Sequence, residues 1–181
     1  LASSVPNLLT YDPAFGFELT VIVREGIRRM YEQQEDLFYY ITLYNENYTH
    51  PGLVEVDKTI DDINKDTIEG ILRGGYCFER QFTDPKRPNV HLLASGSIMQ
   101  QAITAKEMLA DLEINVCLWS ITSFIELERD ALDCDRINRL NPSKDQKVSY
   151  LEEMFCDESG VFVAVSDYMK SLSSGISRWL P

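Results

Sequence analysis

Apolar residues recur at helical spacing in residues 12–31, near the start of the chain. Charged residues fall largely outside the resulting apolar stripe, which consists of Phe15, Leu19, Ile22, Val23, Ile27 and Met30. Asp12 suits a helix N-cap, and Pro13 suits the first helical position. The pattern therefore predicts a helix that begins at Asp12-Pro13, after an extended and loop-like segment 1–11, and ends near Tyr31.

Residues 37–44 form a β-branched and aromatic run with almost no polar break. Such a run is typical of a strand that is covered on both faces, as in a parallel sheet. The preceding helix and this strand together read as the closing half of an α/β unit.

The character of the sequence changes over residues 45–60, which contain turn formers such as Asn45, Asn47 and Pro51-Gly52 and few large apolar groups. We place a domain boundary here. Residues 1–47 would end one domain, and residues 48–181 would form a second.

Predicted helices and strands alternate in the remainder of the chain. A short helix at 68–72 would be capped by Asp66 or Thr67 and ended by Gly74-Gly75. Strands are predicted at 76–82, 90–94, 115–121 and 160–165. Helices are predicted at 98–109, in part of 122–140, at 148–155 and at 168–180. This alternation indicates a three-layer α/β fold with a largely parallel sheet.

Composition and charge narrow the class of protein. The chain has 181 residues, 44% of them hydrophobic and 25% charged, which allows a packed core without metal or disulfide. The net charge of −12 argues against nucleic acid and anionic membranes as partners, and favours solubility. There is no apolar run of membrane-spanning length and no secretory signal pattern, so we expect a cytoplasmic protein. Both ends, Leu1 and Pro181, look like cuts in a longer polypeptide.

The loop Ser95-Gly96-Ser97 joins a predicted strand to a predicted helix, where backbone amides can hold an anion. The sequence contains neither a Gly-x-Gly-x-x-Gly motif nor a phosphate-binding loop with Lys-Ser or Lys-Thr. A tight turn with Ser97 as N-cap is therefore the better interpretation.

The chain has two histidines, and neither supports a hydrolase triad. His91 lies in an apolar strand and reads as a core histidine, and His50 lies in a polar loop and reads as a surface residue. Trp119 and Trp179 lie among apolar residues and are interpreted as core or interface anchors.

Carboxylates and thiols also lack the spacing of a metal site. One acidic run is more typical of a solvated helix face than of a metal centre, and contains Glu126, Glu128, Asp130, Asp133 and Asp135. Cys77 and Cys117 lie in apolar runs and are interpreted as small buried hydrophobes of a reducing compartment. Cys134 and Cys156 lie beside acidic residues, which discourage a reactive thiolate.

A set of short strings follows one another along almost the whole chain in the order and spacing of a known family. They are Tyr11-Asp12-Pro13-Ala14-Phe15, Arg28-Arg29-Met30-Tyr31, Tyr39-Tyr40-Ile41-Thr42, Asn45-Glu46-Asn47-Tyr48, Glu69-Gly70-Ile71-Leu72-Arg73-Gly74, Ala94-Ser95-Gly96-Ser97-Ile98, Thr122-Ser123-Phe124 with Glu126-Leu127 and Arg129-Asp130, and Ser166-Asp167-Tyr168-Met169-Lys170. Together they resemble the homodimeric, bacterial-type decarboxylating component of pyruvate dehydrogenase, in the transketolase superfamily.

The resemblance implies that residues 1–47 are the last helix and strand of a pyrimidine-binding domain. Residues 48–181 would be much of a transketolase-type C-terminal domain, truncated at its end. The parent enzyme would use thiamin diphosphate and magnesium to decarboxylate pyruvate, and would transfer acetyl to lipoyl groups. Its partners would be a second copy of itself and the dihydrolipoyl acetyltransferase. This region would supply a dimer-contributing and partner-facing scaffold.

The resemblance assigns no catalytic, cofactor-binding or metal-binding residue here. The family's Gly-Asp-Gly motif, its activating glutamate and its active-site histidine segment are not identifiable in the sequence. His50 is one residue out of register with a histidine that some relatives carry after Tyr48, because Thr49 stands in that place. An acidic stretch, 54–66, replaces the family's short Met-Pro-x-Gly segment. We expect the isolated chain to be inactive and to bind no cofactor.

Two other classes of function stay open at this point. One is a standalone assembly or binding module built on the transketolase C-terminal fold. The other is a small-molecule-binding α/β protein that uses the Ser95-Gly96-Ser97 loop.

Overall fold

The computed structural model describes residues 4–48, 50 and 63–181. Its first part is a β-α-β unit, formed by β1 (Leu8–Tyr11), α1 (Gly16–Ile27) and β2 (Phe38–Ile41), with the two strands parallel and Leu8 opposite Phe38. The prediction of an extended loop over residues 1–11 is wrong for β1. Four apolar or hydroxyl-bearing residues are too short a run to show a strand period.

Helix α1 begins at Gly16 and not at Asp12-Pro13 as predicted. The Glu18 carboxylate reaches back to accept hydrogen bonds from the backbone N–H groups of Ala14 (2.7 Å) and Phe15 (3.0 Å). These contacts satisfy the amides at the helix start, so Asp12 is released for another role. At its other end α1 continues as a π-helical turn, η2 (Arg28–Glu32), which confirms the predicted end near Tyr31.

The buried face of α1 differs from the predicted stripe. Val21, Ile22 and Gly26 are buried, whereas Val23 is 41% exposed and Ile27 is 50% exposed. Gly26 allows this rotation, because a Cβ there would lie only 3.2 Å from the Tyr39 ring of β2. The predicted stripe is therefore only partly correct: close approach at a glycine decides which face is buried.

Strand β2 lies within the predicted 37–44 run but is not covered on both faces by the described chain. Phe38 is 46% exposed and Tyr40 is 55% exposed. The large apolar side chains on this face therefore have room to contact another polypeptide segment.

The second part is a four-stranded sheet with strand order β3-β5-β4-β6. Its strands are β3 (Tyr76–Gln81), β4 (Asn89–Ala94), β5 (Asn115–Ser120) and β6 (Val161–Val165). β4 pairs in parallel with β5 and with β6, whereas β3 pairs with β5 in antiparallel fashion. The four predicted strands and the largely parallel sheet are confirmed.

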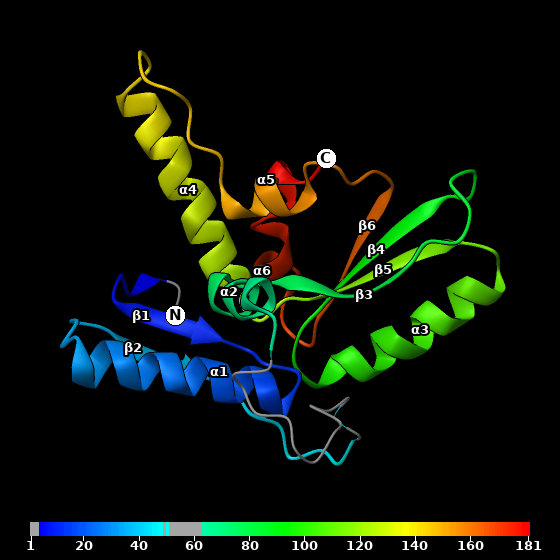
Figure 1. Ribbon diagram of the computed structural model, residues 1–181, viewed down its shortest axis with the longest axis horizontal. Helices are drawn as coiled ribbons and strands as arrows, with labels where there is room; N and C mark the ends of the chain where they lie inside the picture. The colour runs from blue at the N-terminus through cyan, green and yellow to red at the C-terminus, as the bar shows by residue number, and fades with distance from the viewer. Residues whose placement is uncertain (1–3, 49, 51–62) are drawn as a thin grey trace.

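Helices cover both faces of this sheet and form the three predicted layers (Figure 1). On one face α3 (Met99–Asp111) packs on residues such as Leu92 and Leu118. On the other face α4 (Phe124–Leu140), α5 (Tyr150–Phe155) and the C-terminal segment pack on Leu93 and Trp119. All six residues of β5 are buried, as a central strand requires.

Several predicted element ends are corrected by the structure. Helix α2 (Lys65–Arg73) is capped by the Asn64 side chain, which accepts from the Asp66 amide, so Asp66 and Thr67 are not the cap. Gly74 ends it in the left-handed conformation (φ 112°), as predicted. On α3, Met108 is 65% exposed, whereas Met99 is fully buried.

The predicted long helix over 168–180 is wrong. The structure has only α6 (Lys170–Ser174) and a 3-10 turn, η5 (Ser177–Trp179). The Ser173-Ser174-Gly175 sequence has low helix propensity, which explains the interruption.

Residues 51–62, which hold most of the predicted boundary and of the acidic 54–66 stretch, lie outside the described residues. No helix in the described ranges is long and apolar enough to cross a membrane.

Candidate functional site

The carboxyl ends of five strands face one cavity of about 510 Å³. Residues that end or follow these strands line it: Thr10 within β1 and Asp12 after it, Thr42 after β2, Ser95 after β4, Ser123 after β5 and Tyr168 after β6. In α/β proteins the carboxyl ends of parallel strands are the usual place for ligands. This corner is therefore the candidate functional site.

Backbone hydrogen bonds hold this corner together. The Asp12 amide donates to the Thr122 carbonyl at 2.7 Å, and the Gly96 amide donates to the Asp12 carbonyl at 3.1 Å. The end of β1 is thus tied both to the loop after β5 and to the loop after β4. The β-α-β unit and the four-stranded sheet meet at a hydrogen-bonded joint.

The Asp12 carboxylate is held from one side only. Its Oδ1 accepts from Thr42 Oγ1 at 2.5 Å and from the Tyr44 hydroxyl at 2.9 Å, which fixes the side chain. Burial, together with the Asp12 charge and the Tyr168 hydroxyl, raises the pKa of Tyr44, so its hydroxyl stays a donor. Three buried oxygens at this corner have no hydrogen-bond partner within the described structure: Thr10 Oγ1, Asp12 Oδ2 and Ser95 Oγ.

The charged residues that line the cavity are the two carboxylates of Asp12 and Glu128, and its other lining residues include no Lys or Arg. A diphosphate would be repelled here, because binding one requires cations or converging amides. Among the described residues no group of three or more His, Cys, Asp or Glu side chains could hold a metal ion. The cavity therefore does not fit thiamin diphosphate with magnesium.

The Ser95-Gly96-Ser97 loop forms a 3-10 turn, η4 (Gly96–Ile98), with Gly96 at φ +55°. Ile98 occupies the N-cap position of α3, and no side chain caps that helix, so the prediction of Ser97 as N-cap is wrong. The inserted turn moves the helix start one residue onward, from Ile98 to Met99, and leaves Ser97 without a capping role.

We expect Ser97→Ala to change the free energy of unfolding by less than about 0.5 kcal/mol, because no cap is lost. Ser149 provides a matched control, since it caps α5 through a reciprocal pair of contacts with Glu152. Ser149→Ala should cost about 1 kcal/mol. Urea unfolding of both variants measures the difference, and an equal loss in the two would restore Ser97 as a cap.

The two histidines have structural surroundings. His91 is fully buried, and its Nδ1 accepts from Trp119 Nε1 at 3.2 Å. Its Nε2 therefore carries the proton and donates to the Ser159 carbonyl at 3.2 Å, and burial lowers its pKa. The predicted core histidine is confirmed. His50 is exposed as predicted, with Nδ1 accepting from the Gly16 amide at 3.3 Å.

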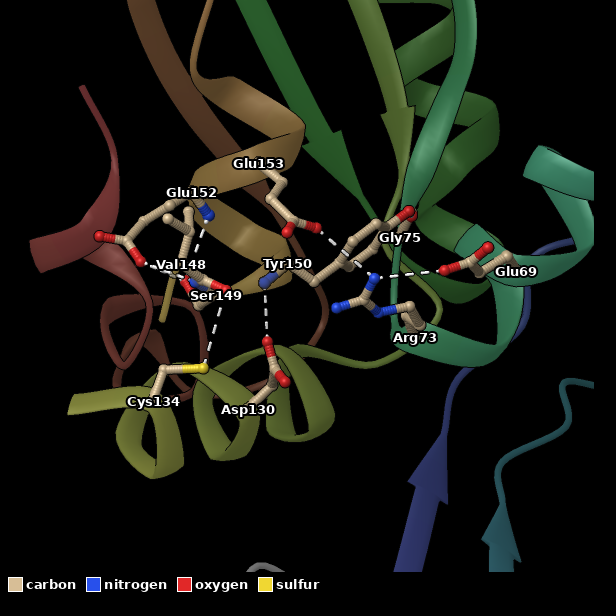
Figure 2. A network of polar contacts seen from close by, with 10 residues as sticks. All are labelled: Glu69, Arg73, Gly75, Asp130, Cys134, Val148, Ser149, Tyr150, Glu152 and Glu153. Atoms are coloured by element: carbon tan, nitrogen blue, oxygen red, sulfur yellow. Dashed lines mark hydrogen bonds and ion pairs between the residues drawn. The ribbon is translucent and has the colours of Figure 1, made fainter. Parts of the chain in front are cut away.

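The acidic run on α4 is divided among separate contacts. Figure 2 shows Asp130 pointing from α4 to the start of α5, where its carboxylate accepts from the Tyr150 amide at 2.7 Å. Glu126 pairs with Arg129 at 2.9 Å, and Asp135 pairs with Arg178 near the C-terminus. These carboxylates hold helices in place and do not converge on one point.

A buried carboxylate that the sequence did not reveal lies at the joint. Glu18 is fully buried, and its Oε1 accepts from the Tyr76 hydroxyl (2.7 Å) and from Ser120 Oγ (2.6 Å). Burial raises its pKa, although all four hydrogen bonds oppose that shift. Its position outside the predicted apolar stripe gave the opposite expectation, and no local motif marks it.

The cysteines follow the predictions only in part. Cys117 is fully buried as predicted, but Cys77 is exposed, and their sulfur atoms lie 3.3 Å apart. Burial and nearby Asp130 raise the pKa of Cys134.

Trp119 is buried in the core, and Trp179 packs against the same cluster, which confirms both as apolar anchors.

Comparisons with known proteins match two parts of this chain to two domain families. A family profile described as the pyruvate dehydrogenase E1 component middle domain matches residues 1–51, and one described as the transketolase-like C-terminal domain matches residues 74–179. The chain is 42% identical over its full length to a pyruvate dehydrogenase E1 component of Pseudomonas aeruginosa, and 38% identical over 98% of its length to that of Escherichia coli K12. It spans 19% of the length of each of these relatives.

The fold is also found in a solved structure. A crystal structure of a transketolase mutant from Pichia stipitis matches 91% of this chain and 19% of its own, with a TM-score of 0.51 and 15% sequence identity. At this identity the likeness concerns the fold alone.

Proposed function

The chain belongs to the transketolase-like C-terminal domain family, on the branch of the pyruvate dehydrogenase E1 components, and we propose that it works as part of such an enzyme. The parent would decarboxylate pyruvate on thiamin diphosphate and transfer the acetyl unit to lipoyl groups of a dihydrolipoyl acetyltransferase in the cytoplasm. The observation that carries this proposal is the 42% identity over the full length of this chain.

Within that enzyme we assign this stretch a scaffold role. The cavity at the strand ends presents carboxylate and hydroxyl oxygens, which suits neither the diphosphate nor a substrate carboxylate. The cofactor supplies the decarboxylation chemistry, and other parts of the parent would hold it together with magnesium. Residues 1–47 would close the pyrimidine-binding domain, and residues 48–181 would form most of the C-terminal domain.

Exposed apolar side chains on α1 and on β2 support a contact role for the β-α-β unit. Val23 and Ile27 on α1, and Phe38 and Tyr40 on β2, are each more than two-fifths exposed. Solvation of such side chains is unfavourable, and a two-stranded sheet is marginal by itself. We assign these side chains to contacts within the parent homodimer, from either protomer.

A direct test uses the complete protein in which this sequence occurs. It should decarboxylate pyruvate with a ferricyanide acceptor, and only when thiamin diphosphate and magnesium are added. The 181-residue chain should show no micromolar or tighter site for thiamin diphosphate with magnesium in isothermal titration. A complete protein that is inactive towards pyruvate but active towards another 2-oxo acid would refute the substrate.

One observation favours a second candidate function, a small-molecule site at the strand ends. The unpartnered oxygens of Thr10, Asp12 and Ser95 would accept donors from an amine or a polyol. Calorimetric titration of the 181-residue chain with small amines and polyols separates this candidate from the scaffold role. Saturable binding that Asp12→Asn abolishes would support it.

A further inference from the structure

Cys77 and Cys117 lie on adjacent antiparallel strands of the four-stranded sheet. Cys77 on β3 is opposite Trp119 on β5, and Cys117 is two residues from Trp119, so the two cysteines are diagonal neighbours on one face. A bulge between Cys77 and Glu79 shifts the register at this point. The two sulfur atoms consequently lie 3.3 Å apart.

The two thiols have unequal surroundings. Cys77 is exposed, whereas Cys117 is fully buried. A hydrogen bond from the Cys117 thiol, aided by the Arg80 guanidinium, lowers the pKa of Cys77 to about 7. The hydrogen bond to Cys77 and burial raise the pKa of Cys117. An accessible thiol with a lowered pKa thus lies beside a buried thiol with a raised pKa.

The cation beside this pair is itself held in place. Arg80 lies opposite Cys117 in the β3–β5 register, and its guanidinium forms an ion pair with Glu158, whose side chain is 8% exposed. The second hydrogen bond of that pair, from Nη1 to Glu158 Oε2, measures 3.2 Å. The positive charge near Cys77 is therefore fixed by a contact from the loop before β6, and does not depend on a freely moving side chain.

We infer that Cys77 and Cys117 form a peroxide-oxidised dithiol, in which Cys77 is the attacking residue and Cys117 the resolving residue. This inference does not depend on the proposed function. The Cys77 thiolate attacks one oxygen of hydrogen peroxide, which gives a sulfenic acid and hydroxide. The Cys117 sulfur then attacks the Cys77 sulfur and displaces the hydroxyl group. That hydroxyl leaves as water with the proton of the Cys117 thiol. Two thiols lose two electrons in total, and the peroxide is reduced to two water molecules.

Closing the bond requires only a small motion. A disulfide needs a sulfur–sulfur distance of about 2.05 Å, so the two sulfur atoms, which lie 3.3 Å apart, must approach by about 1.3 Å. The product would join the edge strand β3 covalently to the central strand β5. Cellular thiols would reverse the reaction, because the exposed Cys77 sulfur is open to their attack.

The experiment exposes the 181-residue chain to a small excess of hydrogen peroxide at pH 7.5 and follows it by thiol alkylation and peptide mass spectrometry. A variant with Cys134→Ser and Cys156→Ser carries only the pair and should behave like the natural sequence. We expect a Cys77–Cys117 disulfide to form at least several-fold faster than an isolated thiol of ordinary pKa is oxidised, because a larger fraction of Cys77 is thiolate. The disulfide should return to two thiols with dithiothreitol.

Two single variants test the assigned roles. With Cys117→Ala, oxidation should stop at a Cys77 sulfenic acid that dimedone traps. With Cys77→Ser, rapid peroxide consumption should disappear. Circular dichroism verifies that both variants fold, and peroxide treatment in denaturant should remove the preference for this pair. The same peptide map on the complete protein supplies a second measurement. Faster oxidation of exposed Cys156, or no disulfide between Cys77 and Cys117 in the folded chain, would overturn the inference.

Discussion

Glu18→Ala should cost at least about 4 kcal/mol of unfolding free energy, because it leaves four buried donors without an acceptor and each lost partner costs about 1–3 kcal/mol. The donors are the amides of Ala14 and Phe15 and the hydroxyls of Tyr76 and Ser120. They come from the β-α-β unit and from the four-stranded sheet. The change should therefore weaken both the start of α1 and the joint between the two parts.

Glu18→Gln provides the matched control. The amide oxygen of Gln can accept from the two backbone N–H groups, and its NH₂ group can donate to the two hydroxyl oxygens, which rotate to accept. The two backbone donors then keep an acceptor, and the two hydroxyl oxygens stay hydrogen-bonded as acceptors, so we expect this variant to lose much less stability than Glu18→Ala. Chemical denaturation compares the two substitutions. A loss below about 1 kcal/mol for Glu18→Ala would show that water replaces the carboxylate.

The raised pKa of Glu18 adds a pH dependence to this comparison. Its protonated form is favoured in the folded state, so its contribution to stability is complete below the ordinary pKa of about 4.3 and is lost as pH rises through the folded value. Gln does not titrate. The Gln variant should therefore gain stability relative to the natural sequence as pH increases above that ordinary pKa. Parallel unfolding curves at pH 5 and pH 8 measure the gain.

The sheet strands were predictable because their apolar residues form unbroken runs. The β5 segment Val116-Cys117-Leu118-Trp119 is buried throughout, and that pattern needs no knowledge of the rest of the fold. The end of α2 at Gly74 was also predictable from local sequence, because glycine readily adopts the left-handed conformation that ends a helix. Short elements were harder to predict from the sequence. The four residues of β1 are too few to show an alternating pattern, and a single 3-10 turn shifts the start of α3.

The joint could not be predicted from local sequence, because it depends on partners far away in the chain. The contact between Glu18 and Ser120 spans 102 residues, and that between Tyr44 and Tyr168 spans 124. Asp12 carries the two signals of an N-cap, yet its carboxylate binds Thr42 and Tyr44. Local propensity is a weak prior that tertiary contacts override. Pairing of Cys77 with Cys117 likewise requires the strand register.

Gly96→Ala should destabilise the chain by about 2–4 kcal/mol through left-handed backbone strain and crowding. Gly96 has φ +55°, and an added Cβ would lie 2.7 Å from the Tyr44 ring and 2.8 Å from Asp12 Oδ2. The Tyr44 ring must then move, which weakens its hydrogen bond to Asp12 and opens the joint where the Gly96 amide meets the Asp12 carbonyl.

Gly16→Ala is the control for this substitution, because an added Cβ at Gly16, the first residue of α1, meets nothing within 4 Å. There the smaller entropy of the unfolded chain should stabilise the fold by about 0.4–1 kcal/mol. The two changes add the same methyl group, so their opposite signs in urea unfolding would isolate the conformation and crowding at Gly96. If Gly96→Ala matched Gly16→Ala, the loop after β4 would have to be free to move away from Asp12, and the strand-end corner would not be the rigid joint that its hydrogen bonds indicate.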